Sequence, residues 1–196
     1  MALEKMRGTP ASIQGLRDLI KVTHLVNFHM AEIGSYAGES TSIFLDCGAA
    51  SILAVDAWGG TEGTDQYSPR RAELVFDKKF NSDSRVVKLK ARSEEAAATC
   101  EPSAFDLLYI DAAHTFPAVV RYVQEWLHTI TPYGFIAGHD LSGGWPGVKL
   151  ALDLCLTPFL GEPFVFQDTS WLYMVPPHPT VRQLILDVPK PDWKYK

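Results

Sequence analysis

Short apolar or alternating runs are separated by amphipathic stretches along most of the chain. The runs are typical of strands, and the expected strands are residues 28–33, 51–55, 85–90, 105–110, 135–138, 164–167 and 171–175. The stretches between them carry apolar residues at helical spacing, and the expected helices are residues 39–46, 69–80, 93–100, 115–130 and 146–156. This alternation predicts a mostly parallel sheet that is covered by helices on both faces.

The C-terminal part departs from this alternation. Residues 164–167 and 171–175 are separated by only three residues, which suits an antiparallel hairpin that closes the sheet. Before them, Pro-Tyr-Gly at 132–134 is expected to form a turn. The last residues are rich in proline, and we expect them to wrap over the surface with one short helix at 181–186.

Length and composition fit one ordinary globular unit. The chain has 196 residues, of which 46% are hydrophobic and 21% are charged. A chain of this size can bury a core of its own, so no disulfide framework is needed. We expect a single domain over residues 1–196, with a helical segment at 1–25 and a proline-rich tail at 176–196.

Charge and cysteine usage disfavour several classes of protein. The formal net charge is −5, whereas nucleic-acid binders usually carry a basic excess. The three cysteines are widely spaced and contain no CxxC pair, which favours free thiols in a reducing compartment. The sequence shows neither a signal peptide nor an apolar run of the ~18 residues that a membrane span needs. The expected location is therefore the cytoplasm.

Acidic residues or glycine stand where four of the expected strands end. They are found at residues 32–34, 56, 111 and 139–140. In open parallel sheets, ligands bind outside the carboxyl ends of the strands. Packing alone does not account for polar residues at four separate strand ends, so we expect a binding site at this edge of the sheet.

The first of these strand ends has the features of a ligand-binding turn. Gly34 and Gly38 allow a tight backbone turn, after which Ser40 opens a helix. Asp56 ends the next strand, where a carboxylate can accept hydrogens from both hydroxyls of a ribose. The alternatives are an ordinary strand-to-helix turn and, for Asp56, a turn cap.

These motifs together resemble class I S-adenosylmethionine-dependent methyltransferases. Residues 32–40 resemble the first motif of catechol-type O-methyltransferases, Asp56 the ribose-binding acid, and residues 91–93 the adenine-lining segment. Residues 110–114 and 132–140 resemble the later motifs. The most similar branch is the small bacterial O-methyltransferase-like group with macrolide-sugar and cephalosporin-associated enzymes.

The resemblance implies a fold and a donor site. The fold is α/β, a Rossmann-like, doubly wound, mostly parallel seven-stranded sheet whose last strand is antiparallel. The donor is S-adenosylmethionine, with S-adenosylhomocysteine as the product. The implied donor-binding residues are Glu32, Gly34, Ser35, Tyr36, Ser40, Thr41, Asp56, Ala57, Trp58, Ser93 and Asp111. For Trp58, stacking on a ligand and packing in a lid are both open.

The later strand ends carry the candidate catalytic groups. Asp111 and Asp140 follow strands that should be neighbours, and two converging carboxylates can bind Mg²⁺ or another divalent cation. His139 is the candidate third ligand, although imidazole suits a transition metal better. His114 is a candidate general base that acts with Asp111 on an acceptor hydroxyl. Alternatively, Asp140 caps a turn, Asp111 holds water or the donor's amino group, and His114 makes a structural hydrogen bond.

The sequence therefore predicts a methyltransferase that acts on a hydroxyl group of a small molecule. Two alternatives are a metal-independent N-methyltransferase and a donor-binding module without catalysis. A nucleotide-binding oxidoreductase is disfavoured by the irregular glycine pattern. The expected partner is a small-molecule acceptor, a homodimer is compatible with the sequence, and neither nucleic acid nor a membrane is favoured. Acceptor recognition is expected from residues 1–25, 57–68 or 141–146, the tail, or a second subunit.

Overall fold

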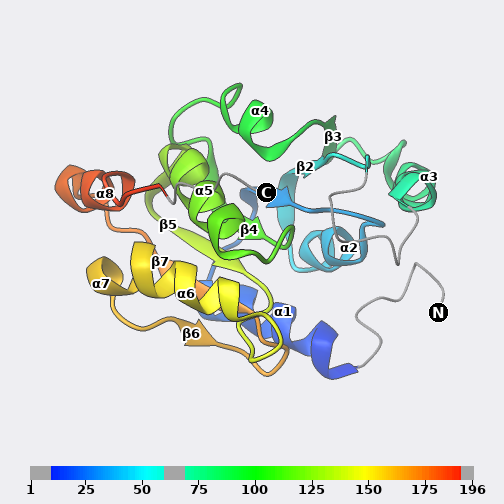
Figure 1. Ribbon diagram of the computed structural model, residues 1–196. Coiled ribbons are helices and arrows are strands. Elements are labelled where there is room, and N and C mark those ends of the chain that lie inside the picture. The colour runs from blue at the N-terminus through cyan, green and yellow to red at the C-terminus, as the bar shows by residue number, and fades with distance from the viewer. Residues whose placement is uncertain (1–9, 60–68, 191–196) are drawn as a thin grey trace.

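A seven-stranded sheet runs through the computed structural model, which describes residues 10–59 and 69–190 (Figure 1). The strand order is β3-β2-β1-β4-β5-β7-β6. Strands β1 to β5 are parallel to one another, whereas β7 is antiparallel to both β5 and β6. The strands are β1 (Phe28–Ile33), β2 (Ala49–Asp56), β3 (Val86–Lys90), β4 (Phe105–Ile110), β5 (Ile130–Gly138), β6 (Phe164–Val165) and β7 (Trp171–Met174). The predicted fold class is confirmed.

Helices cover both faces of the sheet (Figure 1). They are α1 (Pro10–Thr23), α2 (Glu39–Asp46), α3 (Pro69–Phe80), α4 (Ser93–Ala97), α5 (Phe116–Trp126), the 3-10 helix η2 (Leu127–Thr129), α6 (Pro146–Cys155), α7 (Thr157–Leu160) and α8 (Pro179–Leu186). Helices α1, α2 and α3 pack with Met30 and Leu107, whereas α4, α5, α6 and α8 pack with Ala31 and Leu108. Successive strand residues point to opposite faces, so each central strand serves both layers.

The fifth strand begins earlier than the sequence suggests. The expected turn at 132–134 lies within β5, and the expected helix 115–130 stops at Trp126 with a 3-10 turn after it. Ile130 pairs with Phe105 of β4, and Val175 is hydrogen-bonded to Tyr133 and Gly134. Pairing with two neighbouring strands therefore outweighs both the turn signal and the helical periodicity.

Other differences are confined to the ends of elements. Strand β2 begins two residues before the expected position, and α4 ends at Ala97 instead of residue 100. The hairpin strands are shorter than expected, and α8 begins at Pro179. Residues 1–9, 60–68 and 191–196, which carry part of the expected N-terminal segment, acceptor loop and tail, lie outside the described residues.

None of the helices in residues 10–59 and 69–190 combines the length and the apolar character that a membrane crossing requires.

Candidate functional site

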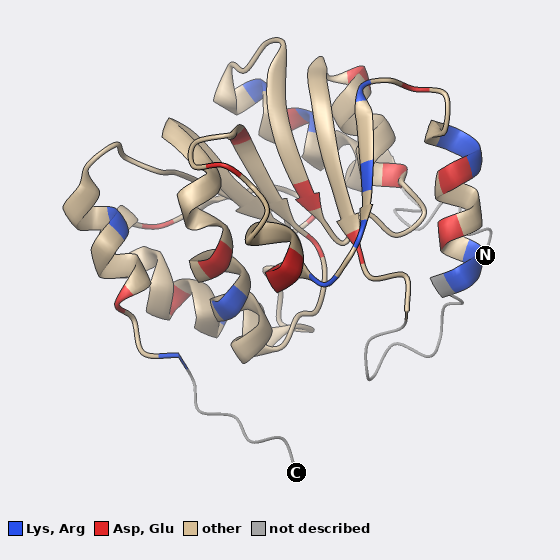
Figure 2. Cartoon of the chain, turned by 90° about the horizontal axis from the view of Figure 1, so that it is seen from above, with Lys and Arg blue, Asp and Glu red and all other residues tan. Residues whose placement is uncertain are grey.

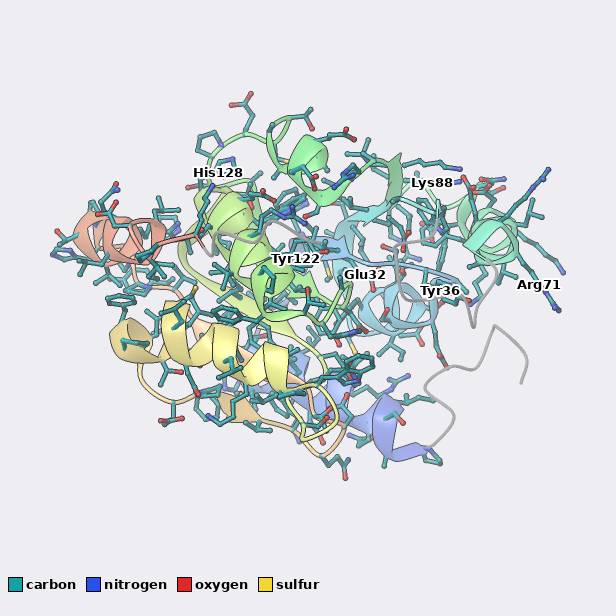
Figure 3. All side chains as sticks on the ribbon, in the orientation of Figure 1. Glu32, Tyr36, Arg71, Lys88, Tyr122 and His128 are labelled. Carbon is teal, nitrogen blue, oxygen red and sulfur yellow. The ribbon has the colours of Figure 1, made fainter. Side chains whose placement is uncertain are left out.

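The turn between β1 and α2 is built on a buried carboxylate. Glu32 is completely buried in β1, an interior strand of the sheet (Figure 3). Ser40 and Thr41, in the first turn of α2, donate hydroxyl hydrogen bonds to its two carboxylate oxygens. Burial raises the pKa of Glu32, and these hydrogen bonds partly oppose that shift. Three of the predicted donor-site residues thus come together and attach the start of α2 to β1.

Gly34 brings this turn against the end of β4. It has a φ of 96°, and its amide donates to the Val55 carbonyl at 2.8 Å. A Cβ at this position would lie 2.0 Å from the Asp111 carbonyl oxygen, far inside any allowed contact. The absence of a side chain therefore allows Asp111 to lie directly beside the turn.

Asp56 connects the loop after β1 with the loop after β2 at the carboxyl edge of the sheet. Its carboxylate accepts hydrogen bonds from the amides of Tyr36, at 2.9 Å, and Trp58, at 2.7 Å. Burial raises the pKa of Asp56, and the two amides work against that shift. Each carboxylate oxygen has further acceptor capacity, so these contacts are compatible with binding a diol.

Trp58 is held in the interior by its own contacts. Its indole N–H donates to the Tyr36 carbonyl at 2.8 Å, and its ring lies 5.2 Å from that of Phe76. The Lys88 ammonium lies 4.7 Å from the ring centre. With 4% of its surface exposed, Trp58 corresponds to the packed lid of the two roles considered.

The remaining predicted donor residues are placed as follows. Ser35 is buried, and its hydroxyl lies 3.4 Å from the Glu32 carbonyl. Ala57 is half-buried between Asp56 and Trp58. Ser93 begins α4, and its hydroxyl accepts a hydrogen bond from the Trp126 indole at 2.8 Å. Ser93 therefore also has a structural partner in α5.

A group of acids and histidines lies where β4 and β5 end. These strands are neighbours, so Asp111 and Asp140 are brought to the same edge. His114 Nε2 lies 2.7 Å from Asp140 Oδ2 and 3.7 Å from Asp111 Oδ1. His139 Nδ1 lies 3.2 Å from Asp140 Oδ1. The structure thus brings together all four residues predicted to carry metal or catalysis, which we call the acid–histidine group.

The charges within this group are strongly coupled. Burial disfavours the charged form of His114, but hydrogen bonds and charge from Asp111 and Asp140 outweigh it and raise its pKa to about 9. Burial likewise disfavours charge on Asp140, but the two histidines hold the pKa of that carboxyl well below its usual range. Without a bound cation, His114 is therefore protonated at neutral pH.

The donor atoms also fit a divalent cation. Ligand atoms of Asp111, His139 and Asp140 all lie within 4.8 Å of one another, and each residue is partly exposed. Two carboxylate oxygens suit a hard cation, whereas an imidazole nitrogen shifts the preference toward a transition metal. Figure 2 shows acidic segments at the arrowhead ends of central strands, so this edge carries concentrated negative charge.

Sequence reasoning missed two contributors to this region. Asp168, treated only as a turn residue, places its Oδ2 3.9 Å from His139 Nε2. Gly147 in α6 presses on the chain near His114, since a Cβ there would lie 2.5 Å from the His114 carbonyl oxygen. Trp145, in the segment 141–146 that is expected to recognise the acceptor, has its ring 4.6 Å from the His114 ring and is 48% exposed. Only the tertiary contacts distinguish Asp168 from other turn residues and Gly147 from other helix residues.

Comparison with known proteins identifies the family of this arrangement. A family profile described as a methyltransferase domain matches residues 31–141. A search of curated proteins found no significant match. The turn between β1 and α2, which we call the donor-type turn, lies within the matched residues together with Asp56 and the whole acid–histidine group.

Solved structures share the fold at low sequence identity. A putative O-methyltransferase from Klebsiella pneumoniae has a TM-score of 0.58 at 20% identity, over 86% of this chain and 81% of that one. An O-methyltransferase from Bacillus cereus, solved with S-adenosylhomocysteine, has a TM-score of 0.58 at 15% identity, over 85% and 82%. A putative sarcosine dimethylglycine methyltransferase from Galdieria sulphuraria has a TM-score of 0.51 at 14% identity, over 66% of this chain. The chain spans only 46% of the length of that protein.

Proposed function

The chain belongs to the methyltransferase domain family, and on that premise we propose that it transfers a methyl group from S-adenosylmethionine to a hydroxyl group of a small molecule. The observation that carries this proposal is the contact between two halves of the site. Asp111 lies against Gly34 in the donor-type turn and, on its other side, 3.7 Å from His114. A methyl donor held by the turn would therefore lie next to groups that can act on an acceptor.

The donor half has the polarity that this cofactor requires. The sulfonium of S-adenosylmethionine is a cation, so acidic neighbours favour its binding. Asp56 would accept hydrogens from the ribose, since its oxygens keep acceptor capacity beyond the amides of Tyr36 and Trp58. Holding the methyl carbon in line with the acceptor oxygen can supply about 7–11 kcal/mol of the barrier.

The acceptor half supplies a base whose protonation depends on its neighbours. With a pKa of about 9, His114 carries its proton at pH 7 and accepts none. Its role as base requires that the negative charge of Asp111 and Asp140 be offset. Asp111, His139 and Asp140 would hold a divalent cation, which offsets that charge and lowers the pKa of a hydroxyl that it binds. His114 would take the hydroxyl proton as the acceptor oxygen bonds to the methyl carbon. The bond from that carbon to sulfur breaks at the same time, and its electron pair stays on the sulfur of the departing S-adenosylhomocysteine.

Calorimetry with S-adenosylhomocysteine tests the donor site. We expect saturable binding to the intact chain and an at least tenfold weaker affinity for Asp56→Ala, which loses the carboxylate. The matched control is Asp187→Ala, which removes an exposed carboxylate that bonds Gln183 in α8. Absence of binding to the unsubstituted protein would contradict the proposal.

A screen with radiolabelled donor tests the acceptor class and the cation. We expect label to pass to hydroxyl compounds, to be lost with a chelator and to return with a divalent cation. Transfer to amines that is indifferent to chelator would instead indicate a metal-independent N-methyltransferase. Donor binding without transfer to any acceptor would indicate a binding module.

A further inference from the structure

A buried carboxylate in the β6–β7 hairpin, which is not a member of the acid–histidine group, lies close to His139 of that group. Asp168 lies in the turn of this hairpin, and its side chain is fully buried. Ser170 donates from its amide, at 3.1 Å, and from its hydroxyl, at 2.9 Å, to the two Asp168 oxygens. Carboxylates are rarely buried in full unless they are paired, and the contacts of Asp168 with Ser170 and His139 agree with that rule.

Helix α1 is shaped to leave room for this carboxylate. A Cβ on Gly15 would lie 2.1 Å from both the Asp168 carboxyl carbon and its Oδ1. Glycine in a helix interior costs about 1 kcal/mol relative to alanine. Glycine at this position therefore costs α1 some stability and leaves space for the Asp168 carboxyl group.

The hairpin turn is attached to the segment that carries His139. The Trp171 indole donates to the His139 carbonyl at 3.1 Å, and the Leu141 amide donates to the Thr169 carbonyl at 3.0 Å. Between these attachments, His139 Nε2 faces Asp168 Oδ2 at 3.9 Å, while its Nδ1 lies 3.2 Å from Asp140 Oδ1. The imidazole thus lies between two carboxylates, one facing each ring nitrogen.

We propose that Asp168 is a positioning residue that orients the His139 ring and presents its Nδ1 to the acid–histidine group. Because it concerns the same group, this inference rests on the proposed function. A histidine ligand commonly donates its other ring N–H to a carboxylate, which fixes the ring orientation. Asp168 Oδ2 faces the other ring nitrogen, Nε2, at 3.9 Å, which is longer than a hydrogen bond, so it acts on the ring through its charge. Gly15 leaves room for this carboxylate, and Ser170 binds it.

Binding of Mn²⁺ alone to the full chain tests this role. We expect Asp168→Asn to weaken Mn²⁺ affinity about 10- to 100-fold in calorimetry, the range found for loss of such partners. The affinity for S-adenosylhomocysteine should stay within twofold, because Asp168 lies outside the donor turn. The control is Asp187→Asn, which changes an exposed carboxylate directly after α8. Unchanged Mn²⁺ affinity in folded Asp168→Asn would overturn the proposal.

A second variant keeps the test valid if Asp168→Asn fails to fold. Gly15→Ala retains the carboxylate but displaces it, so Mn²⁺ affinity should fall in the same direction. Unchanged Mn²⁺ affinity in folded Gly15→Ala would count against the proposal in the same way.

If the unsubstituted protein binds no Mn²⁺, the metal part of the proposed function fails, and the positioning role is decided by NMR. Long-range ¹H–¹⁵N spectra at fixed pH, with the His139 signals assigned through His139→Gln, report which ring nitrogen carries hydrogen. Asp168→Asn should alter that pattern. An unaltered pattern would overturn the positioning role by itself.

Discussion

At the scale of single residues, the site is governed by charges that are close together and partly removed from water. His114, Asp111 and Asp140 come from two strand ends, and their mutual attraction outweighs the cost of burying them. At Glu32 the cost of burial is the larger effect, and it raises the pKa despite the hydrogen bonds from serine and threonine side chains. A carboxylate therefore has a raised pKa at Glu32 and a lowered one at Asp140, according to the charge of its neighbours.

The raised pKa of His114 predicts how stability changes with pH. A group whose pKa is raised on folding stabilises the fold below its unfolded value, and this contribution is lost as the pH passes the folded value. For His114 the window runs from 6.5 to about 9. With chelator present, we expect the protein to lose roughly 1–3 kcal/mol of unfolding free energy across this window.

Urea titrations at several pH values measure this loss, and His114→Gln is the control. The variant lacks the titrating ring, so its stability should change less over the same window. Parallel pH profiles for the two proteins would contradict the coupling of His114 to the two carboxylates.

At the scale of elements, the contact between the β1–α2 turn and the end of β4 determines whether the donor half meets the catalytic half. Gly34 permits that contact by combining a φ of 96° with the lack of a side chain. Gly48, between α2 and β2, has nearly the same backbone with a φ of 99°, but nothing lies within 4 Å of its absent Cβ. Comparing substitutions at Gly34 and Gly48 therefore separates the cost of a positive φ from the cost of a steric clash.

We expect Gly34→Ala to be more destabilising than Gly48→Ala. Both variants place a side chain at unfavourable φ, but only at Gly34 must the Asp111 backbone move. The additional loss should be at least about 2 kcal/mol, which is typical of overpacking, and should be accompanied by loss of S-adenosylhomocysteine binding. Urea unfolding and calorimetry of both variants measure this. Equal losses of unfolding free energy in the two variants would contradict this prediction, because they would show that the Asp111 backbone can move without cost.

At the scale of the whole molecule, ion pairs and hydrogen bonds attach the outer helices α3 and α8 to the sheet. Basic residues follow α3 and β3 at one side (Figure 2), where Lys88 pairs with Glu73 and Asp77 at 2.9 and 2.6 Å. Arg71, in α3, points away from the body of the molecule (Figure 3), as a solvated face would. At the other end, Arg182 of α8 donates to the carbonyls of Leu127, Ile130, Thr131 and Pro176.

Arg182 is therefore expected to hold α8 against the start of β5. Arg182→Ala should lower the free energy of unfolding by about 2–4 kcal/mol, because several hydrogen bonds from a charged donor are lost together. The free energy of unfolding of Arg182→Lys should lie between those of the unsubstituted protein and Arg182→Ala, since a single ammonium cannot reach all four carbonyls. The affinity for S-adenosylhomocysteine should be unchanged, and a loss of donor binding would contradict the separation of this contact from the site.

The sequence by itself determined the architecture and the polar edge. Apolar runs alternating with helical periodicity require a two-sided parallel sheet, and a parallel sheet necessarily gathers Glu32, Asp56, Asp111 and Asp140 at its carboxyl ends. Local signals were sufficient for this, because the period of side-chain burial depends only on neighbouring positions along the chain.

Only the tertiary structure decided the contacts within that edge. The early start of β5, the pairing of His114 with Asp140 and the approach of Asp168 to His139 depend on which elements lie side by side. His139 and Asp168 are brought together by a hairpin and accommodated by a glycine in α1, which is far from both in sequence. Such contacts depend on distances of a few ångströms between distant segments, and no local pattern of residue types encodes them.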